Sequence, residues 1–446
     1  MIYDIIGVGF GPANIALAIA LEEEGLGGTH LFLERNAGPG WQENMMLPGS
    51  DIQNHPLRDL VTPSNPRSRY SFTNFLHEHD RLFEFLNLGI TYPLREEYAQ
   101  YVRWAADAFK DNVRYGVEVE EITVGDDVTQ GGRRANVPGK GAHYVVRTSQ
   151  GVFQARTLVV APGRSPNIPQ VFEPLMGREV FHLTQYRPRI EALMPLLSKG
   201  GAVAVVGASQ SGVEIALDLE RRFPAATVHC VIRSYGFRLK DTSPFSDEIY
   251  FPEFVDYYFN ASAQNKSRLN EELRYTNYSS VDADVLHQLY LTRYMHRLRG
   301  SKRLQVHQSA QILKAKASGA RISLSLHNDV NQDTGRLDVD AVVLATGFKN
   351  FGRDGKEELF HPLLKNIVSH LQVDEQLGAL VNRDYSVRVA QGSELPMLFL
   401  NGLCESTHGF GDAGSFSLLS LRAREIARAI GARKPAARMS SEVLHG

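Results

Sequence analysis

The sequence predicts an α/β protein with two Rossmann-like dinucleotide-binding domains and a smaller, mostly helical substrate-binding insertion. A short apolar strand, a cluster of small residues and a helical segment follow one another at residues 2–21 and again at 202–221. A third region, residues 240–279, is too polar for a pure core and too aromatic for a linker. We expect it to bind substrate, with a helical cap as the alternative. A chain of 446 residues is long enough for this organisation.

The N-terminal segment, residues 2–14, reads IYDIIGVGFGPAN and is predicted to form a strand, a tight turn and a helix start. Gly7 is expected to form the turn, Gly9 to let backbone N–H groups approach a pyrophosphate, and the helix N-terminus to favour its negative charge. Gly11 is a further candidate cofactor-binding residue of the motif. Pro12 takes the last position of the G-x-G-x-x-G pattern, where proline suits the first helical turn. A purely structural turn is the alternative interpretation.

Two side chains downstream are candidates for the same nucleotide site. Residues 29–33 are predicted to form the second strand, which ends at Glu34. An acid at this place binds ribose hydroxyls in dinucleotide folds, and a solvated loop acid is the alternative. Trp41 lies in a Gly/Pro-rich loop and either packs over an adenine or flavin ring or covers the core.

The second turn, AVAVVGASQSGVE at residues 202–214, repeats this arrangement with Gly207, Ser209 and Gly212 as the small residues. The following strand, 227–232, ends at Arg233, where the first unit has Glu34. An acid repels a 2′-phosphate and a cation attracts one. The first site is therefore predicted to bind FAD and the second NADPH, although Arg233 is alternatively a surface cation.

These assignments give a division of the chain. Apolar strands at 157–161 and 342–346 each stop at a glycine and are expected to return towards the cofactors. We predict the following division: an FAD-binding domain of residues 1–170 and 340–446, an NADPH-binding domain of 171–240 and 300–339, and an insertion of 241–299. Segments 71–87 and 96–109 are predicted helices, and 113–124 is predicted to be strand.

The polar, proline-broken segment 51–70 is a candidate wall of the site, because its side chains are dense in hydrogen-bonding groups. Arg58 stands out, since a guanidinium holds a carboxylate through two parallel hydrogen bonds. A solvated connection is the alternative interpretation.

The composition excludes several classes of protein. The net charge of −2 implies no general attraction to nucleic acid or to an anionic membrane. No apolar run reaches the length of a spanning helix, and the first strand leaves no room for a signal peptide, so we expect a cytoplasmic protein. Cys230 and Cys404 belong to no C-x-x-C pair or metal cluster, so neither disulfide-reductase chemistry nor a metal site is expected.

Several motifs together resemble the N-hydroxylating flavoprotein monooxygenases, the ornithine and lysine N-hydroxylases of siderophore assembly, with the ornithine branch closer. They extend from end to end of the chain. The motifs are GVGFGPAN at 7–14, QNHPLRDL at 53–60, FLHE at 75–78, YVRWA at 101–105, SPF at 243–245, TNYS at 276–279, ATG at 345–347, THG at 407–409 and SLLS at 417–420.

The resemblance implies a reaction. NADPH reduces FAD, NADP⁺ stays bound, O₂ adds to the flavin C4a to give a hydroperoxide, and a neutral primary amine takes the distal oxygen. Gln53 is then expected against the flavin, and Asn277 between the nicotinamide and the substrate. Both are the expected catalytic residues. Further cofactor contacts are implied for Val119, Gln210, Ser211, His408 and Leu419, and a substrate contact for Ser417.

The sequence departs from the family in its expected substrate loops. Arg58 replaces the lysine that holds the substrate carboxylate, and Asp247 replaces a substrate-binding asparagine. The loop between His408 and Ser417 is also longer than usual. An added carboxylate favours a second cation or repels an α-carboxylate, so the resemblance implies an ornithine-like amine without choosing it.

The expected partners are a small primary amine and O₂, with a homodimer or homotetramer possible. Two other functions are alternatives. One is a Baeyer–Villiger or sulfur-oxidising flavin monooxygenase, which shares paired Rossmann units, although its His/Trp-rich signature is absent from the sequence. The other is a non-catalytic flavin-binding redox sensor.

Overall fold

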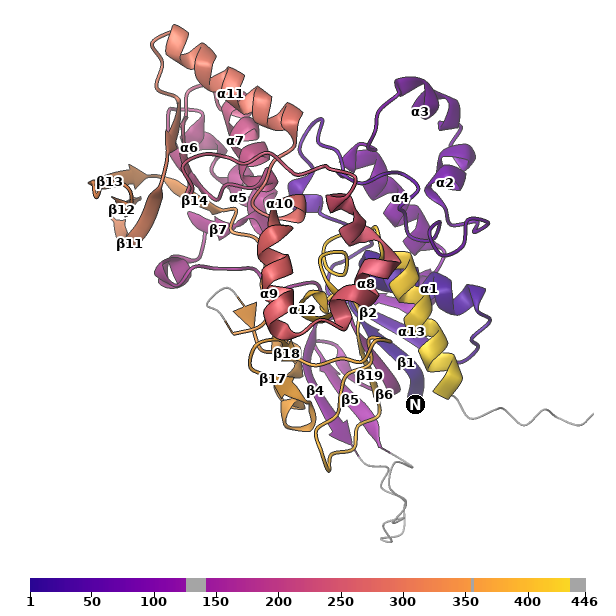
Figure 1. The fold of residues 1–446 in the computed structure, drawn as a ribbon. Helices are drawn as coiled ribbons and strands as arrows, with labels where there is room; N and C mark the ends of the chain where they lie inside the picture. The colour runs from indigo at the N-terminus through magenta and orange to yellow at the C-terminus, as the bar shows by residue number, and fades with distance from the viewer. Residues whose placement is uncertain (126–141, 354–356, 434–446) are drawn as a thin grey trace, which may run out of the picture.

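The structure is a computed structural model that describes residues 1–125, 142–353 and 357–433. Two α/β units lie one above the other, and a group of helices lies beside them (Figure 1). The chain leaves the first sheet after β6 and returns to it in β19, having formed the second sheet in between. Within the described ranges, no helix is both long and apolar enough to cross a membrane.

The first unit is built on a sheet with strand order β3-β2-β1-β6-β5-β4, to which β19 adds beside β6. β1 is parallel to β2 and β6, whereas β5 is antiparallel to β4 and β6. Helices α1 (Pro12–Glu23) and α13 (Leu419–Arg433) pack against each other beside this sheet (Figure 1). Its strands are β1 (Ile2–Val8), β2 (His30–Glu34), β3 (Val113–Tyr115), β4 (Val119–Gly125), β5 (His143–Thr148), β6 (Gly151–Val160) and β19 (Met397–Leu400).

Two segments of this unit are broken where the sequence predicted continuous elements. The predicted helix 71–87 is split into α2 (Phe72–Glu78) and α3 (Leu82–Leu88), because Asp80 between them has φ 56°. The predicted strand 113–124 is split into β3 and β4 at Gly116, which has φ 71°. A left-handed residue continues neither a right-handed helix nor a strand. The predicted helix 96–109 is observed as α4 (Arg95–Asp107).

The second unit has a parallel sheet with strand order β10-β9-β8-β14-β7. Helix α7 (Gln210–Arg222) packs against α11 (Ala283–Leu298), and α5 (Tyr186–Ala192) and α6 (Met194–Leu197) share the same core. An antiparallel sheet, β11-β12-β13, packs on this unit through a separate apolar cluster. The strands are β7 (Val180–His182), β8 (Ala202–Val206), β9 (Thr227–Val231), β10 (Leu304–His307), β11 (Ala310–Ser318), β12 (Arg321–Asn328), β13 (Thr334–Val339) and β14 (Ala341–Leu344).

The strand pairing differs from the predicted division of the chain at two points. β14 lies in the second sheet, between β7 and β8, although the prediction began the FAD-binding domain at residue 340. Helix α11 packs on α7 of the second unit, although the prediction placed it in the insertion. The physical reason is the crossover that a parallel pair requires, because β9 and β10 are parallel and α11 leads into β10.

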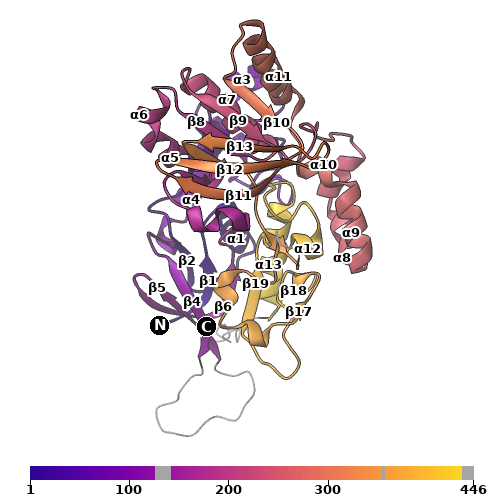
Figure 2. The ribbon, with the colours of Figure 1, turned by 90° about the vertical axis from the view of Figure 1, so that its left-hand side faces the viewer.

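The insertion itself consists of α8 (Pro252–Phe259), α9 (Ala263–Glu272) and α10 (Arg274–Asn277). Helix α8 packs against α12 (Glu405–His408), so the insertion touches the C-terminal part of the first unit. Figure 2 shows α8 and α9 together at one edge of the molecule. The remaining short strands are β15 (Asn350–Phe351), β16 (Glu357–Glu358), β17 (Val373–Asp374) and β18 (Gly378–Ala379).

Candidate active site

The first dinucleotide turn begins two residues later than the sequence suggested. Gly7 lies inside β1, where it pairs with Phe32 of β2 and Val159 of β6. A Cβ at Gly7 would stand 2.3 Å from a ring carbon of Phe32. The prediction that Gly7 forms the turn is therefore wrong. Close packing between the strands explains why a glycine occupies this position instead.

The turn is formed by Gly9, which has φ 83° and would place a Cβ 2.5 Å from the carbonyl oxygen of Ala161. Gly11 is the N-cap of α1, with Pro12 next to it, and a Cβ there would meet nothing within 4 Å. The side-chain nitrogen of Asn14 donates to the Gly9 carbonyl at 2.7 Å. The observed pattern is thus Gly-x-Gly-x-x-Asn, with open space at a helix N-terminus, which suits a pyrophosphate.

Glu34 lies at the end of β2 and is almost fully buried. Its carboxylate accepts hydrogen bonds from the backbone N–H groups of Phe10 at 2.7 Å and Asn36 at 2.9 Å. Glu34 therefore shapes the first turn directly. Its predicted contact with a ribose stays a prediction.

The second turn repeats the first at the end of β8. Gly207 has φ 139°, and a Cβ there would stand 2.2 Å from the carbonyl oxygen of Ala345. Ser209 is the N-cap of α7, and a Cβ at Gly212 would stand 2.8 Å from the Gly207 carbonyl oxygen. Arg233 follows β9, is exposed, and makes no hydrogen bond or ion pair within the described residues. It is thus available to an anionic group at this turn.

One cleft of about 600 Å³ collects most of the other predicted residues. Its lining comes from both units and from the insertion. The predicted residues among its walls are Trp41, Gln53, Arg58, Gln210, Ser211, Asp247, Asn277 and Ser417. Side chains that sequence reasoning did not single out, such as Tyr92, Lys240 and Tyr250, line the same cleft. The tertiary structure therefore joins residues that are hundreds of positions apart in the sequence.

Trp41 is fixed in the cleft wall by edge-on ring contacts. Its ring centroid lies 5.8 Å from that of Tyr98 and 5.3 Å from that of Phe416, with interplanar angles of 64° and 83°. Such T-shaped contacts are favoured between aromatic rings. Of the two interpretations from sequence, packing against the core is observed, and Trp41 also borders the cleft.

Arg58 and Ser417 form one wall of the cleft. Nη1 of Arg58 donates to Oγ of Ser417 at 3.4 Å, and this hydroxyl donates to Oδ1 of Asn54 at 3.2 Å. The guanidinium carbon also lies 5.8 Å from the ring centroid of Tyr250. Arg58 has no ion pair with a carboxylate in the described parts of the chain. A guanidinium without such a partner is available to a ligand carboxylate.

Asp247 and Tyr250 share a 3₁₀ turn, Ser246–Tyr250, and both line the cleft. Burial raises the pKa of Asp247, and the positive charges of Arg58 and Lys240 oppose this shift. The Asp247 carboxylate has no hydrogen-bond or ion-pair partner among the residues that the structure describes. The Tyr250 hydroxyl donates to Oδ1 of Asn277 at 3.2 Å, and burial raises the Tyr250 pKa well above its usual value.

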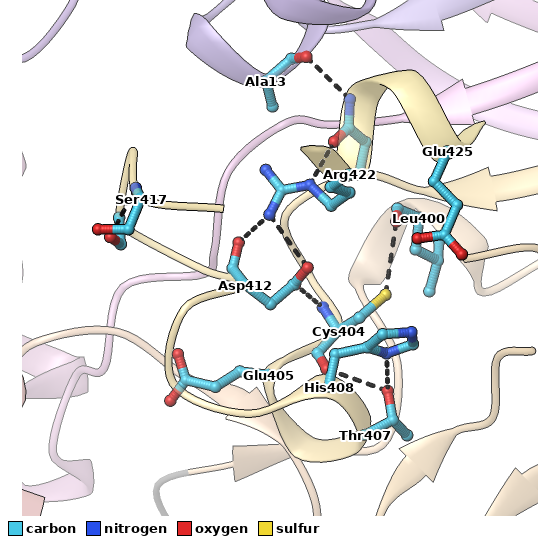
Figure 3. Close-up of polar contacts among 12 residues, drawn as sticks. Ala13, Leu400, Cys404, Glu405, Thr407, His408, Asp412, Ser417, Arg422 and Glu425 are labelled. Atoms are coloured by element: carbon cyan, nitrogen blue, oxygen red, sulfur yellow. Dashed lines mark hydrogen bonds and ion pairs between the residues drawn. The ribbon is translucent and has the colours of Figure 1, made fainter. Parts of the chain in front are cut away.

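The small residues of the two dinucleotide turns, with Pro12, Glu34 and Arg233, lie outside the lining of this cleft, and so do three further predicted cofactor residues. His408 is buried, stacks on Tyr385 at a centroid distance of 4.2 Å, and has its pKa lowered to about 4 by burial. One ring nitrogen lies within hydrogen-bonding distance of Thr407 (Figure 3). The other lies within hydrogen-bonding distance of the backbone carbonyl of Arg383. Val119 and Leu419 belong to the core of the first unit. The structure gives all three a packing role, and their cofactor contacts stay predictions.

A buried ion pair that the sequence did not reveal anchors the lengthened loop. Nη1 of Arg422, from α13, lies 3.0 Å from Oδ1 of Asp412, and both side chains are almost fully buried (Figure 3). Nε of Arg422 donates to Asn401, which in turn donates to the carbonyl of Ala13 and to Asn14 at the first turn. The arginine-rich closing helix was the only sequence signal for this contact.

Comparison with known proteins agrees with this geometry. A sequence profile described as L-lysine 6-monooxygenase/L-ornithine 5-monooxygenase matches residues 1–350. The L-ornithine N(5)-monooxygenase of Pseudomonas aeruginosa is 34% identical over 433 residues, covering 96% of this chain and 93% of that protein. The chain belongs to this family. The resemblance inferred from the sequence motifs is confirmed.

Solved structures of this monooxygenase family share the whole fold. The Kutzneria sp. 744 ornithine N-hydroxylase KtzI, described with FADred, NADP⁺ and L-orn, is 32% identical and superimposes with a TM-score of 0.86, covering 98% of this chain and 100% of that chain. The L-lysine 6-monooxygenase of Pseudomonas syringae is 36% identical with a TM-score of 0.81, covering 96% and 99%. The predicted α/β fold with two Rossmann-type domains is thereby confirmed.

Proposed function

We propose that the chain is an FAD-, NADPH- and O₂-dependent N-hydroxylase that converts the primary amine of an ornithine-like amino acid to a hydroxylamine. The observation that carries this proposal is the single cleft that brings Gln53, Arg58, Asp247, Asn277 and Ser417 together between two dinucleotide turns. Family membership supports the reaction class, and KtzI supports the cofactor pair.

The two turns fit the two cofactors as follows. The open space at Gly11 and the N-terminus of α1 would hold the FAD pyrophosphate, and the N-terminus of α7 with Arg233 would hold NADPH. The bound flavin supplies the redox chemistry: NADPH provides two electrons, one oxygen atom of O₂ goes to the amine nitrogen, and the other leaves as water. The NADPH-binding domain would then include helix α11 and would end at Leu344, the last residue of β14.

The charges of the cleft suit a zwitterionic substrate. Arg58 lacks a carboxylate partner and Asp247 lacks a cationic partner within ion-pair distance in the described structure, so the cleft offers a free charge of each sign. We assign the α-carboxylate of an amino acid to Arg58 and its α-ammonium group to Asp247. The side-chain amine then extends towards Asn277.

The reacting amine has to be neutral, because a protonated nitrogen has no lone pair for the oxygen atom. A carboxylate beside it would favour the ammonium form. Asp247 therefore serves the reaction only if it binds the far end of the substrate, away from Asn277. We further propose that the hydroxylamine enters a siderophore or a similar natural product and that the protein acts in the cytoplasm.

The test measures NADPH oxidation and hydroxylamine formation for ornithine, lysine, diamines, a ketone and a thioether. We expect hydroxylamine from an amino acid with a side-chain amine, and we expect Asp247→Asn to lower the preference for amino acids over diamines by about ten-fold, the worth of one charge-assisted hydrogen bond. Glu248→Gln, an exposed carboxylate on the same turn, is the matched control and should leave the preference unchanged.

Three results would contradict the proposal or a part of it. Turnover of the ketone or thioether without any amine product would indicate a different oxygenase. Reduction of flavin with only hydrogen peroxide as product, for every amine, would remove the hydroxylase function for those substrates. An unchanged amine preference in Asp247→Asn would remove that residue from the substrate site.

A further inference from the structure

A closed ring of hydrogen bonds joins the first unit to the second beside the cleft. We name it the polar ring. Its first-unit members are held together by short links: the backbone N–H of Gln53 donates to Oδ1 of Asp51 at 2.9 Å, and the carbonyl of Asp51 accepts from Arg95 at 3.1 Å. The members of the polar ring are Asp51, Gln53, Arg95, Gln210, Glu214 and Asp282.

The ring crosses between the units at two places. Arg95 pairs with Glu214 of α7 through two contacts of 3.0 and 3.1 Å, and both side chains are buried. At the second place, the side-chain nitrogen of Gln53 donates to Oδ2 of Asp282. Removing one partner from a buried ion pair strongly destabilises a protein. The Arg95–Glu214 pair therefore holds the two units together next to the second crossing.

Gln210 closes the ring at the second dinucleotide turn. Its side-chain oxygen accepts from the backbone N–H of Asp282 at 2.9 Å, and its side-chain nitrogen donates to Oε1 of Glu214 at 3.0 Å. Gln210 is also the first residue of α7 and lines the cleft. Any group that binds at this helix N-terminus therefore lies next to the residue that fixes the Asp282 backbone.

The chemistry of Asp282 determines how Gln53 is oriented. An ionised carboxylate only accepts hydrogen bonds, so it selects the NH₂ end of the Gln53 amide. The carbonyl oxygen of Gln53 is then left as the end without a partner in the described structure, at the wall of the cleft. Lys240 lies 3.8 Å from the other oxygen of Asp282.

The backbone of Gln53 is also strained. It has φ 52°, a left-handed conformation that is uncommon outside glycine. Strain of this kind persists when surrounding contacts determine it, here the hydrogen bonds to Asp51 and Asp282. Both the backbone N–H and the side-chain amide of Gln53 are thus hydrogen-bonded, so neighbouring residues determine the orientation of the side chain.

We propose that Asp282 is a positioning residue, which holds the Gln53 amide with its carbonyl oxygen towards the flavin and couples that orientation to occupation of the second dinucleotide turn through Gln210. This inference rests on the proposed function for the identity of the two cofactors. It assigns to Asp282 a role that does not require contact with substrate or cofactor.

The first experiment titrates the purified holoprotein with NADP⁺ and follows the visible absorbance of the flavin. In the parent protein we expect NADP⁺ to shift the flavin spectrum. Asp282→Ala should lose most of this shift and form several-fold less hydroxylamine per NADPH, with unchanged flavin content. Asp282→Asn should restore much of both, because its amide oxygen still accepts from Gln53. The matched control is Asp284→Ala, an exposed carboxylate in the first turn of α11.

The second experiment tests the hydrogen bond without relying on turnover. The melting temperature is measured for Gln53→Ala, Asp282→Ala and the double variant. We expect the double variant to melt close to the less stable single variant, because the two side chains share one interaction. Additive losses would overturn the proposal, as would an Asp282→Ala protein with the spectral shift and product yield of the parent. A parent protein that binds no flavin contradicts the proposed function instead.

Discussion

The two dinucleotide turns of this chain follow the same backbone path but are stabilised by different means. In each turn, a glycine of positive φ lies against the backbone carbonyl of an alanine. Gly9 lies against Ala161, and Gly207 lies against Ala345. Each alanine follows the strand that pairs with the turn's own strand. The close approach of two backbones, rather than the number of glycines, is what the two turns have in common.

The third position of the pattern shows the difference. At Gly212 a Cβ would stand 2.8 Å from the Gly207 carbonyl, so only glycine fits. The first turn has Asn14 there instead, and its amide donates to the Gly9 carbonyl. Asn14 is connected to the C-terminal helix through Asn401, whereas the second turn is connected to the cleft through Gln210. The first turn is thus joined to the C-terminal helix of its own unit, and the second turn to residues beside the cleft.

The largest effect is expected from adding a methyl group at the shared glycine. Gly207→Ala and Gly9→Ala should each lower the free energy of unfolding by about 2–5 kcal/mol, from left-handed strain and overlap with a carbonyl oxygen. Denaturant unfolding measures this loss. Gly11→Ala is the control, since its Cβ meets no atom within 4 Å, and its stability should stay near that of the parent. Equal losses at all three positions would break the comparison.

The charges that follow the turns should decide the choice of nicotinamide cofactor. Arg233→Ser should lower the preference for NADPH over NADH by about 10- to 100-fold, the worth of hydrogen bonds to a charged phosphate. The ratio of kcat/KM for the two cofactors measures this. Arg238→Ser, at another exposed arginine of the same loop, should leave the ratio unchanged. A preference that survives Arg233→Ser would show that the 2′-phosphate is bound elsewhere.

A smaller, pH-dependent effect should distinguish the segments behind the two turns. His182 lies within 2.9 Å of the Gly347 carbonyl behind the second turn, and burial lowers its pKa from 6.5 to about 4. Between about pH 6.5 and 4, His182 therefore binds a proton in the unfolded chain but not in the folded chain. The free energy of unfolding falls as the pH falls through this range, by at most about 1.4 kcal/mol per pH unit. Unfolding of His182→Gln across this range should show a flatter slope.

The control for this slope is His287→Gln, which replaces an exposed histidine on α11. We expect its stability to follow the parent at every pH. If His182→Gln kept the full slope of the parent, the acid sensitivity would have to come from other buried histidines, such as His408 in the first unit.

The sequence by itself determined the features that depend on local chemistry. Strand, small-residue turn and helix are encoded within about a dozen neighbouring residues, and so both dinucleotide units were predictable. The register of the first turn was not, because GVGFG offers glycines at two registers. Only the pairing of Gly7 within β1 and the contact of Gly9 with Ala161 choose between them.

Only the tertiary structure decided the site as a whole. Arg58, Asp247 and Ser417 come from three distant segments, and no spacing rule reveals that they share a cleft, because the sheet topology brings them together. His408 shows the converse, since its motif suggested a cofactor contact while packing buries it against Tyr385. The polar ring has no sequence signal, because its hydrogen bonds exist only where two folded units meet.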